Sequence, residues 1–189
     1  MDLRTFIRPE AIPLQPIPTL GTPAPTAPEL AVAPGRPCII AFLRHVGCPF
    51  AEATFRRLAP FSQAYRAVEF VAVSHATADA TASWCAMLGG ATHVRVVIDT
   101  DRTLYAAWGL GLTDAGHFLG ARSLAAVARL AAGGIRNRHP SGTRWQTAGT
   151  FALDKDGIVR WRHIPAHAGD LPDVERAVVA LLGMPIARG

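Results

Sequence analysis

The residues best suited to chemistry in this chain are a cysteine and the proline that follows it. Residues 38–43 form an apolar run typical of a buried strand, and residues 44–47 form a polar turn with a glycine. Pro49 suits the first position of a helix, because its missing N–H has no partner there. Cys48 is therefore expected at the N-cap, where unpaired backbone N–H groups and the helix dipole stabilise a thiolate, the reactive form of the side chain.

Two cationic side chains precede this cysteine. Arg44 and His45 are candidates for stabilising the thiolate, and a guanidinium can also polarise a peroxide oxygen. Because side chains alternate along an extended segment, at most one of the two is expected to face the pocket. The alternative for each is a surface residue or a turn hydrogen bond. For Cys48 itself, the alternative is a small buried apolar residue.

Several segments resemble one protein family. Residues 42–51 look like the active-site segment of the peroxiredoxin-like branch of the alkyl hydroperoxide reductase/thiol-specific antioxidant (AhpC/TSA) family. Other segments that are similar to motifs of this family are residues 21–25, 99–110, 149–159 and 167–170. The resemblance covers roughly residues 20–183. It implies a thioredoxin-like α/β fold and thiol-based redox chemistry.

The chain also departs from the pattern of that family. Typical members have a proline seven residues and a threonine or serine three residues before the sulfur, where this chain has Ala41 and His45. A family arginine before the glycine of the late strand is replaced by Ala148, and a common second cysteine by Ala51. The arginines that could serve instead are Arg44, Arg136, Arg138 and Arg144.

The resemblance also suggests a role for a second thiol. Atypical two-cysteine thiol peroxidases place their resolving cysteine on the helix after the second strand, and Cys85 lies on the corresponding predicted helix. The alternative is a cysteine packed within the protein. Cys38 begins the apolar strand, and the length of that strand keeps it too far from Cys48 for a disulfide.

The elements that position these residues alternate between strands and helices. Strands are expected at residues 38–44, 68–73 and 94–98, and helices at residues 49–65, 78–88 and 101–108, with the first helix kinked or broken at Pro60. This alternation predicts a parallel core sheet. Residues 150–153 and 158–161 then predict an antiparallel hairpin, and residues 171–182 a final helix. The predicted fold is thus a thioredoxin-like central mixed sheet flanked by helices.

Two further segments surround this predicted domain, which spans residues 38–189. Residues 1–37 carry nine of the fifteen prolines and are expected to form an extended arm that lies on the domain or reaches a partner. Residues 112–147 form an insertion before the hairpin, with a helix at residues 123–132. The loop at residues 133–147 is rich in arginine and glycine, and we expect it to close over the thiol.

Composition limits the class of protein. The 189 residues are half apolar with a net charge of +5, which is consistent with one folded domain that has an arginine-rich surface. No apolar stretch predicts a transmembrane helix or a secretory signal, and three cysteines suit a reducing cytoplasm. Basic residues are not interleaved with aromatic ones, so no nucleic-acid partner is expected. No cofactor or metal is expected either, because Pro165 separates His163 from His167.

These observations predict a thiol-dependent peroxidase. The Cys48 thiolate would reduce a peroxide, and Cys85 or an external thiol such as glutathione or thioredoxin would then restore it. Two alternatives remain open: an oxidoreductase that acts on an endoperoxide or a protein disulfide, and a non-catalytic binding module with the same fold. The resemblance also implies a possible homodimer.

Overall fold

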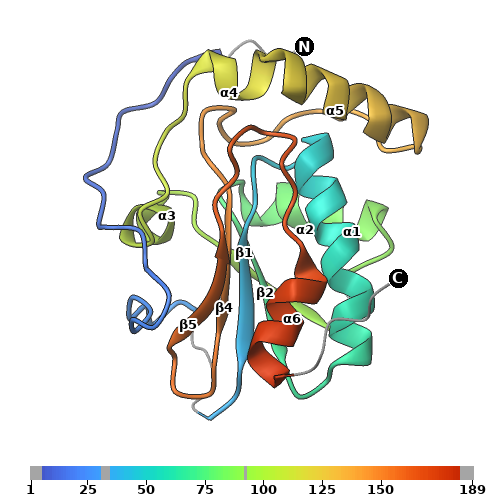
Figure 1. Cartoon of the computed structure of the whole chain (residues 1–189). Helices are drawn as coiled ribbons and strands as arrows, with labels where there is room; N and C mark the ends of the chain where they lie inside the picture. The colour runs from blue at the N-terminus through green and yellow to red at the C-terminus, as the bar shows by residue number, and fades with distance from the viewer. Residues whose placement is uncertain (1–5, 31–34, 92, 184–189) are drawn as a thin grey trace.

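The computed structural model describes residues 6–30, 35–91 and 93–183. Its centre is a five-stranded sheet with helices on both faces (Figure 1). The strands are β1 (Cys38–Phe42), β2 (Glu69–Ser74), β3 (Val94–Ile98), β4 (Gly149–Leu153) and β5 (Val159–His163). The helices are α1 (Pro49–Ala64), α2 (Ala78–Met87), α3 (Thr103–Ala107), α4 (Ala115–Leu119), α5 (Ala121–Ala132) and α6 (Val174–Leu182).

The strand order in the sheet is β3-β2-β1-β4-β5. β1 pairs in parallel with β2, and β2 in parallel with β3, as expected for strands joined by helical crossovers. β4 runs antiparallel to both β1 and β5. β1 is therefore the central strand, and all five of its residues are buried. This arrangement confirms the predicted mixed sheet.

The two faces of β1 belong to two separate hydrophobic clusters. Ile39 and Ala41 pack on the side of α1 and α6. Ile40 and Phe42 pack on the other side, against α3 and the chain that follows it. Because alternate side chains of a strand point to opposite faces, the apolar run of β1 supplies both cores.

Several predicted boundaries differ from the structure. α1 continues through Pro60 to Ala64, so the expected break is absent. α3 begins at Thr103, where the Asp99 carboxylate accepts hydrogen bonds from its N–H and hydroxyl groups. α4 was not predicted: it is a short helix within the insertion and is capped by the Asp114 side chain. α6 begins at Val174, three residues later than expected.

The described part of the N-terminal arm lies on the domain. Gly21 donates a hydrogen bond to the Val159 carbonyl, and Val159 donates one to the Thr22 carbonyl, so the arm extends the edge at β5. Leu30 is buried in the cluster around α3. Figure 1 shows the arm passing α3 toward α4 and α5, which cover the upper end of the sheet.

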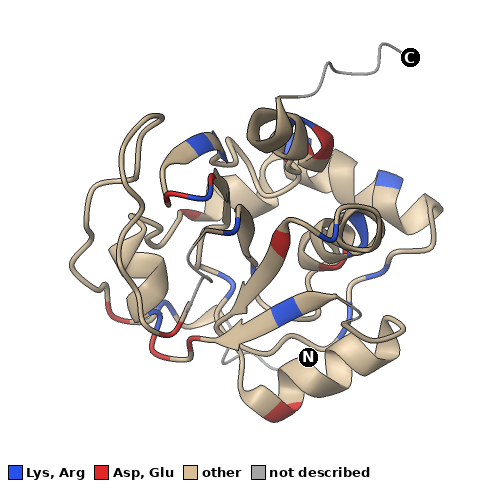
Figure 2. Ribbon diagram, turned by 90° about the horizontal axis from the view of Figure 1, so that it is seen from below, with Lys and Arg blue, Asp and Glu red and all other residues tan. Residues whose placement is uncertain are grey.

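Charged residues are spread over the ribbon rather than gathered on one element (Figure 2). Within the described residues, no helix is long and apolar enough to cross a membrane.

Candidate active site around Cys48

Cys48 lies at the junction between the central strand and α1. It is the N-cap residue of α1, with extended backbone angles (φ −74°, ψ 131°), and Pro49 begins the helix. The Cys48 carbonyl accepts the hydrogen bond of Glu52 N–H at 3.1 Å, while Cys48 N–H donates to the His45 carbonyl. The predicted N-cap position is confirmed. Only 5% of Cys48 is exposed, so the thiol sits in an enclosed position.

The loop at residues 138–144 packs on the turn that precedes Cys48. Arg138 N–H donates to the Gly47 carbonyl at 2.9 Å, and Ser141 N–H donates to the Val46 carbonyl at 3.1 Å. Gly47 has a φ of +85°, and a Cβ atom there would lie 2.3 Å from the His139 carbonyl oxygen. Glycine therefore permits both the turn and the close approach of the loop. The insertion covers the thiol end of the domain, as predicted.

Arg44 is buried beside this loop. One of its terminal nitrogens, Nη2, donates to the Arg144 carbonyl at 2.7 Å, and its guanidinium lies 5.8 Å from the centre of the Phe118 ring. Its Nε and Nη1 atoms have no hydrogen-bond partner within the described residues. Arg44 also lines a cavity of about 20 Å³ together with Ala148 and Gly149. Arg44 thus lies next to position 148, where the family pattern has an arginine and this chain has Ala148.

His45 is buried as well, but it does not line that cavity. Its Nδ1 lies 3.0 Å from the Val46 carbonyl oxygen, to which a protonated Nδ1 donates. Burial above all, together with the nearby Arg44 and Arg144, lowers the pKa of His45 to about 3, against the opposing effect of the bond to Val46. The imidazole is therefore neutral at physiological pH and adds no positive charge beside the thiol.

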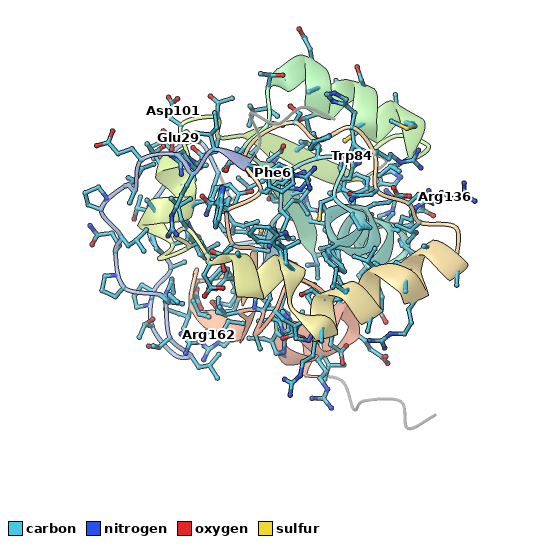
Figure 3. All side chains as sticks on the ribbon, turned by 90° about the horizontal axis from the view of Figure 1, so that it is seen from above. Phe6, Glu29, Trp84, Asp101, Arg136 and Arg162 are labelled. Carbon is cyan, nitrogen blue, oxygen red and sulfur yellow. The ribbon has the colours of Figure 1, made fainter. Side chains whose placement is uncertain are left out.

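The three arginines of the insertion have different surroundings. The pKa of Arg144 is lowered by burial and, to a smaller extent, by the nearby Arg44, while the charge of Cys48 opposes this shift. Arg138 instead pairs with Glu52 at 3.0 Å. Arg136 is exposed and lies at the edge of the molecule beyond α5 (Figure 3). Of the three, Arg144 is thus the one whose pKa is affected by the charge of Cys48.

Glu52 connects the loop to the first turn of α1. Its carboxylate is buried and accepts hydrogen bonds from Arg56 at 2.9 Å and from Arg138 at 3.0 Å. Burial raises the pKa of Glu52, but the bonds to Arg138 and Arg56 outweigh this effect and lower it. The carboxylate is thus ionised and held by two guanidinium groups.

The structure also places two histidines in this region that the sequence analysis did not select. The Nε2 of His75 lies 3.1 Å from the Thr143 carbonyl oxygen, and its Nδ1 has no partner within the described residues. Burial lowers the pKa of His75 to about 4. The Nε2 of His117, on α4, is likewise buried and unpartnered. The sequence could have indicated His75, because this residue directly follows the second strand and therefore lies at the same edge of the sheet as the turn at residues 44–48.

The remaining cysteines occupy apolar positions. All three cysteines are free. Cys85 lies on α2 and belongs to the same hydrophobic cluster as Cys48, and burial raises its pKa. Cys38 lies at the other end of β1 and belongs to the opposite cluster, and burial raises its pKa far above the ordinary value.

The fold is shared with thiol-dependent enzymes. A peroxiredoxin-like protein from Aquifex aeolicus has a TM-score of 0.62 at 16% identity, with 88% of each chain covered. A thiol peroxidase from Chromobacterium violaceum has a TM-score of 0.61 at 13% identity, with 88% of this chain and 89% of that one covered. Peroxiredoxin 6 of Arenicola marina has a TM-score of 0.60 at 12% identity, with 86% and 71% covered. These similarities confirm the thioredoxin-like, peroxiredoxin-type fold.

A family model described as AhpC/TSA antioxidant enzyme matches residues 54–167, which is more than half of the chain. The protein therefore belongs to the AhpC/TSA antioxidant enzyme family, and the predicted resemblance is confirmed. The matched segment begins after Cys48, so the role of this cysteine depends on the geometry described above. No curated protein matches the sequence.

Proposed function

We propose that the protein is a thiol-dependent peroxidase in which Cys48 is the nucleophile. The observation that carries this proposal is the position of Cys48 at the start of α1, enclosed by the insertion loop, which donates hydrogen bonds to the turn before Cys48 and carries the cation of Arg144. A thiolate in this position is stabilised by the helix N-terminus and by the cation. Family membership supports the same class of chemistry.

The proposed first step is a displacement on the peroxide. The Cys48 thiolate attacks one oxygen of the O–O bond, a sulfur–oxygen bond forms, and the O–O bond breaks. The products are a sulfenic acid on Cys48 and an alkoxide, which takes up a proton and leaves as an alcohol or, from hydrogen peroxide, as water. Arg44, four residues before Cys48, has buried N–H groups without a partner among the described residues, and in this proposal they stabilise negative charge on the leaving oxygen.

The proposed second step restores the thiol. Cys85 or an external thiol condenses with the sulfenic acid, which releases water and forms a disulfide. A further external thiol then reduces this disulfide by thiol–disulfide exchange, which leaves the Cys48 thiol free. A disulfide between Cys48 and Cys85 requires Cα atoms within about 7 Å, and Cys48 begins α1 while Cys85 lies inside α2. If these atoms lie farther apart than this in the reduced protein, an intramolecular cycle requires the first turn of α1 to unwind. An external thiol such as glutathione or thioredoxin needs only access to Cys48.

The alternatives from the sequence are less well supported. Membership of the antioxidant enzyme family favours a peroxide over a protein disulfide as the substrate. A non-catalytic module has no need of the buried Arg44 guanidinium, which forms no ion pair among the described residues, since burying an unpaired charge costs free energy. We also propose that the protein works in a reducing cytoplasm, as three free cysteines favour. A homodimer remains a further proposal, drawn from the family resemblance.

The direct test is chemical trapping of the sulfenic acid. The reduced protein is treated with one equivalent of hydrogen peroxide or tert-butyl hydroperoxide in the presence of dimedone, and the adducts are mapped by mass spectrometry. We expect the adduct on Cys48, with Cys38 and Cys85 unmodified. An adduct only on Cys85, or neither an adduct nor a disulfide at Cys48 at an excess of either peroxide, would exclude Cys48 as the nucleophile.

A further inference from the structure

A pocket lined by arginines lies at the end of the sheet opposite Cys48, where the parallel strands β1, β2 and β3 begin. This is the lower end of the sheet in Figure 1. The pocket has a volume of about 540 Å³, which is in the range of small-molecule sites. Three separate segments contribute its arginines: Arg36 precedes β1, Arg66 lies between α1 and β2, and Arg95 lies on β3. The chemistry proposed for Cys48 does not use this pocket.

Neutral groups of the chain hold two of these guanidinium groups in place. Arg36 donates to the Arg66 carbonyl at 2.6 Å and to the Ala67 carbonyl at 3.4 Å. Arg66 donates to the Gln63 carbonyl at 3.0 Å and to Nδ1 of His93, which also lines the pocket. This imidazole nitrogen is the acceptor, because an arginine can only donate. A guanidinium carries five N–H groups, so both arginines keep donors for a ligand.

The positive charge of the pocket is only partly compensated. Its described lining includes one carboxylate, that of Glu69, which pairs with Arg95 at 2.7 Å. Arg95 also donates to the Leu30 carbonyl. Among the residues that the structure describes, Arg36 and Arg66 take part in no ion pair, and the hydrogen-bond acceptors that hold them are uncharged. Two positive charges therefore line this pocket without a counterion from the described part of the chain.

The charged groups of the pocket also act on a common neighbour, Cys38, the first residue of β1. Burial raises the pKa of Cys38 far above its ordinary value, and Glu69 raises it further, while Arg95 and Arg36 oppose this shift. The three charged side chains thus lie close to the start of the central strand. This agrees with the pairing of Cys38 with Glu69 in the register of β1 and β2.

We propose that this pocket binds a small molecule that carries a phosphomonoester group. Such a group has close to two negative charges at neutral pH and three acceptor oxygens, which match the two uncompensated charges of Arg36 and Arg66. Guanidinium groups bind phosphate through paired N–H···O bonds, and groups that are already held in place lose less entropy on binding. The pocket is larger than one phosphate group, so it also has space for the organic part of the ligand.

The test compares a phosphate ester with its parent sugar. Ribose 5-phosphate and ribose are titrated separately into the reduced full-length protein by isothermal titration calorimetry, near neutral pH and at constant ionic strength. We expect ribose 5-phosphate to bind with a Kd below about 1 mM and ribose to bind at least about tenfold more weakly. A Kd above about 1 mM for ribose 5-phosphate, or equal affinity for the two compounds, would overturn the proposal.

Variants locate the site. Arg36→Gln and Arg66→Gln should each weaken the binding of ribose 5-phosphate at least about tenfold, because each removes charge-assisted hydrogen bonds. Glu69→Gln keeps an acceptor for Arg95 but removes the negative charge, so it should tighten binding about threefold or more. Arg122→Gln, an exposed arginine on α5, is the control that removes the same charge elsewhere. Binding that survives both Arg36→Gln and Arg66→Gln, or that falls equally in Arg122→Gln, contradicts the assignment.

The variant Cys48→Ser separates this site from the thiol. It should bind ribose 5-phosphate with the Kd of the wild type, whatever its effect on peroxide turnover. If the wild type binds ribose 5-phosphate but reduces no peroxide, the phosphate site stands and the peroxidase function fails. If it reduces peroxide but does not bind ribose 5-phosphate, the reverse holds. Loss of binding in Cys48→Ser would place the ligand at the thiol end and overturn the proposal.

Discussion

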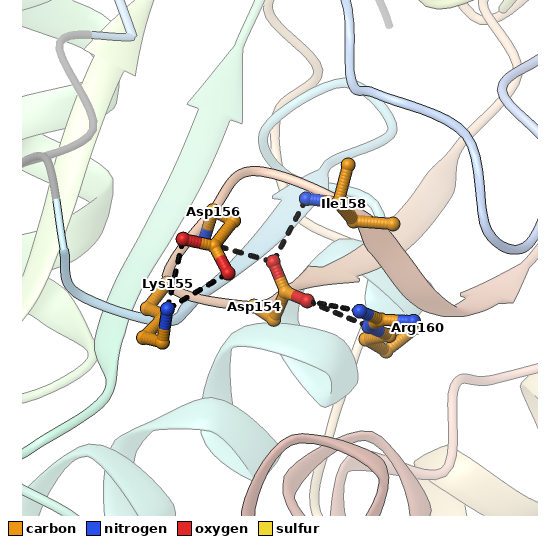
Figure 4. A network of polar contacts seen from close by, with 5 residues as sticks. All are labelled: Asp154, Lys155, Asp156, Ile158 and Arg160. Carbon is orange, nitrogen blue, oxygen red and sulfur yellow. Dashed lines mark hydrogen bonds and ion pairs between the residues drawn. The ribbon is translucent and has the colours of Figure 1, made fainter.

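The turn before Cys48 and the turn of the β4–β5 hairpin each contain a glycine with positive φ, but the two turns have different surroundings. The turn before Cys48 has Gly47 at φ +85°, and the turn of the β4–β5 hairpin has Gly157 at φ +75°. Figure 4 shows the hairpin turn, where the Asp154 carboxylate accepts hydrogen bonds from the N–H groups of Asp156 and Ile158 and pairs with Arg160 at 2.6 Å. Every partner in this network is local in sequence.

The turn before Cys48 has the opposite character. Its polar side chains are buried, and two nitrogen atoms of Arg44 have no partner in the part of the chain that the structure describes. Its contacts come from residues about 100 positions away along the chain. A satisfied polar cluster at the surface is explained by the structure of the turn alone. A buried polar cluster with unsatisfied atoms is not explained by the structure of its turn alone. This difference favours the Cys48 turn as the functional site.

The largest effect that distinguishes the two turns is expected from the thiol itself. Cys48→Ser should reduce peroxide turnover by at least about 1,000-fold, because a serine hydroxyl is not ionised at neutral pH and is a poor nucleophile. Lys155→Ala, in the hairpin turn, should leave turnover unchanged and alter the free energy of unfolding by about 0.5 kcal/mol or less. A coupled thiol-consumption assay measures both variants. Wild-type turnover in Cys48→Ser would remove the functional distinction between the two turns.

Acid should destabilise the Cys48 region through its buried histidines. The pKa of His75 is about 4 in the folded protein, below its ordinary value of 6.5, so the unfolded chain binds more protons between these two values. The contribution of neutral His75 to the free energy of unfolding is fully present above about pH 6.5. It is lost as the pH falls toward 4, and the loss is roughly 3 kcal/mol. Burial of His45 extends the loss toward pH 3.

Urea unfolding at several pH values measures this dependence. His75→Gln retains an N–H donor for the Thr143 carbonyl but does not titrate, so the decline between pH 6.5 and 4 should be smaller in this variant. The hairpin contributes in a different range: burial raises the pKa of Asp154, but the bonds from Ile158 and Arg160 outweigh this effect and lower it. Its stabilisation is therefore lost only at more acidic pH. Equal slopes in wild type and His75→Gln would contradict the assignment.

A matched pair of glycine substitutions compares the two turns directly. Gly157→Ala should cost about 1 kcal/mol, since a Cβ atom there meets nothing within 4 Å and only the backbone conformation is penalised. Gly47→Ala should cost about 2–3 kcal/mol, because its Cβ would also overlap the His139 carbonyl. The same displacement of the loop should accelerate alkylation of Cys48. Equal costs for the two variants would show that the loop does not pack on the turn.

The smallest effect concerns the N-terminal arm over the thiol end. Trp145 donates a hydrogen bond to the Phe6 carbonyl at 3.0 Å, and the Arg144 guanidinium lies 4.5 Å from the centre of the Phe6 ring. Trp145→Phe removes a hydrogen bond of about 1 kcal/mol and should raise the rate of Cys48 alkylation by up to about fivefold. Trp161→Phe, on β5, is the control. An unchanged rate in Trp145→Phe would show that this contact does not limit access.

Much of the fold could be predicted from the sequence because its signals are local. The apolar run of β1, the turn at residues 44–47 and Pro49 are contiguous, so the N-cap position of Cys48 followed from neighbouring residues alone. The β4–β5 hairpin was predicted for the same reason. The boundaries at Pro60 and Thr103 were not, since tertiary packing extends or shortens a helix beyond its local preference.

The surroundings of the thiol were decided by the tertiary structure. The sequence showed several arginines that could act on Cys48, but only the folded chain separates Arg144, whose pKa is affected by the charge of Cys48, from Arg138, which pairs with Glu52. It also brings His75 and the insertion loop to the turn before Cys48. Such contacts join residues far apart in the chain. They depend on how the central sheet pairs β1 with both β2 and β4, which no local pattern of residues specifies.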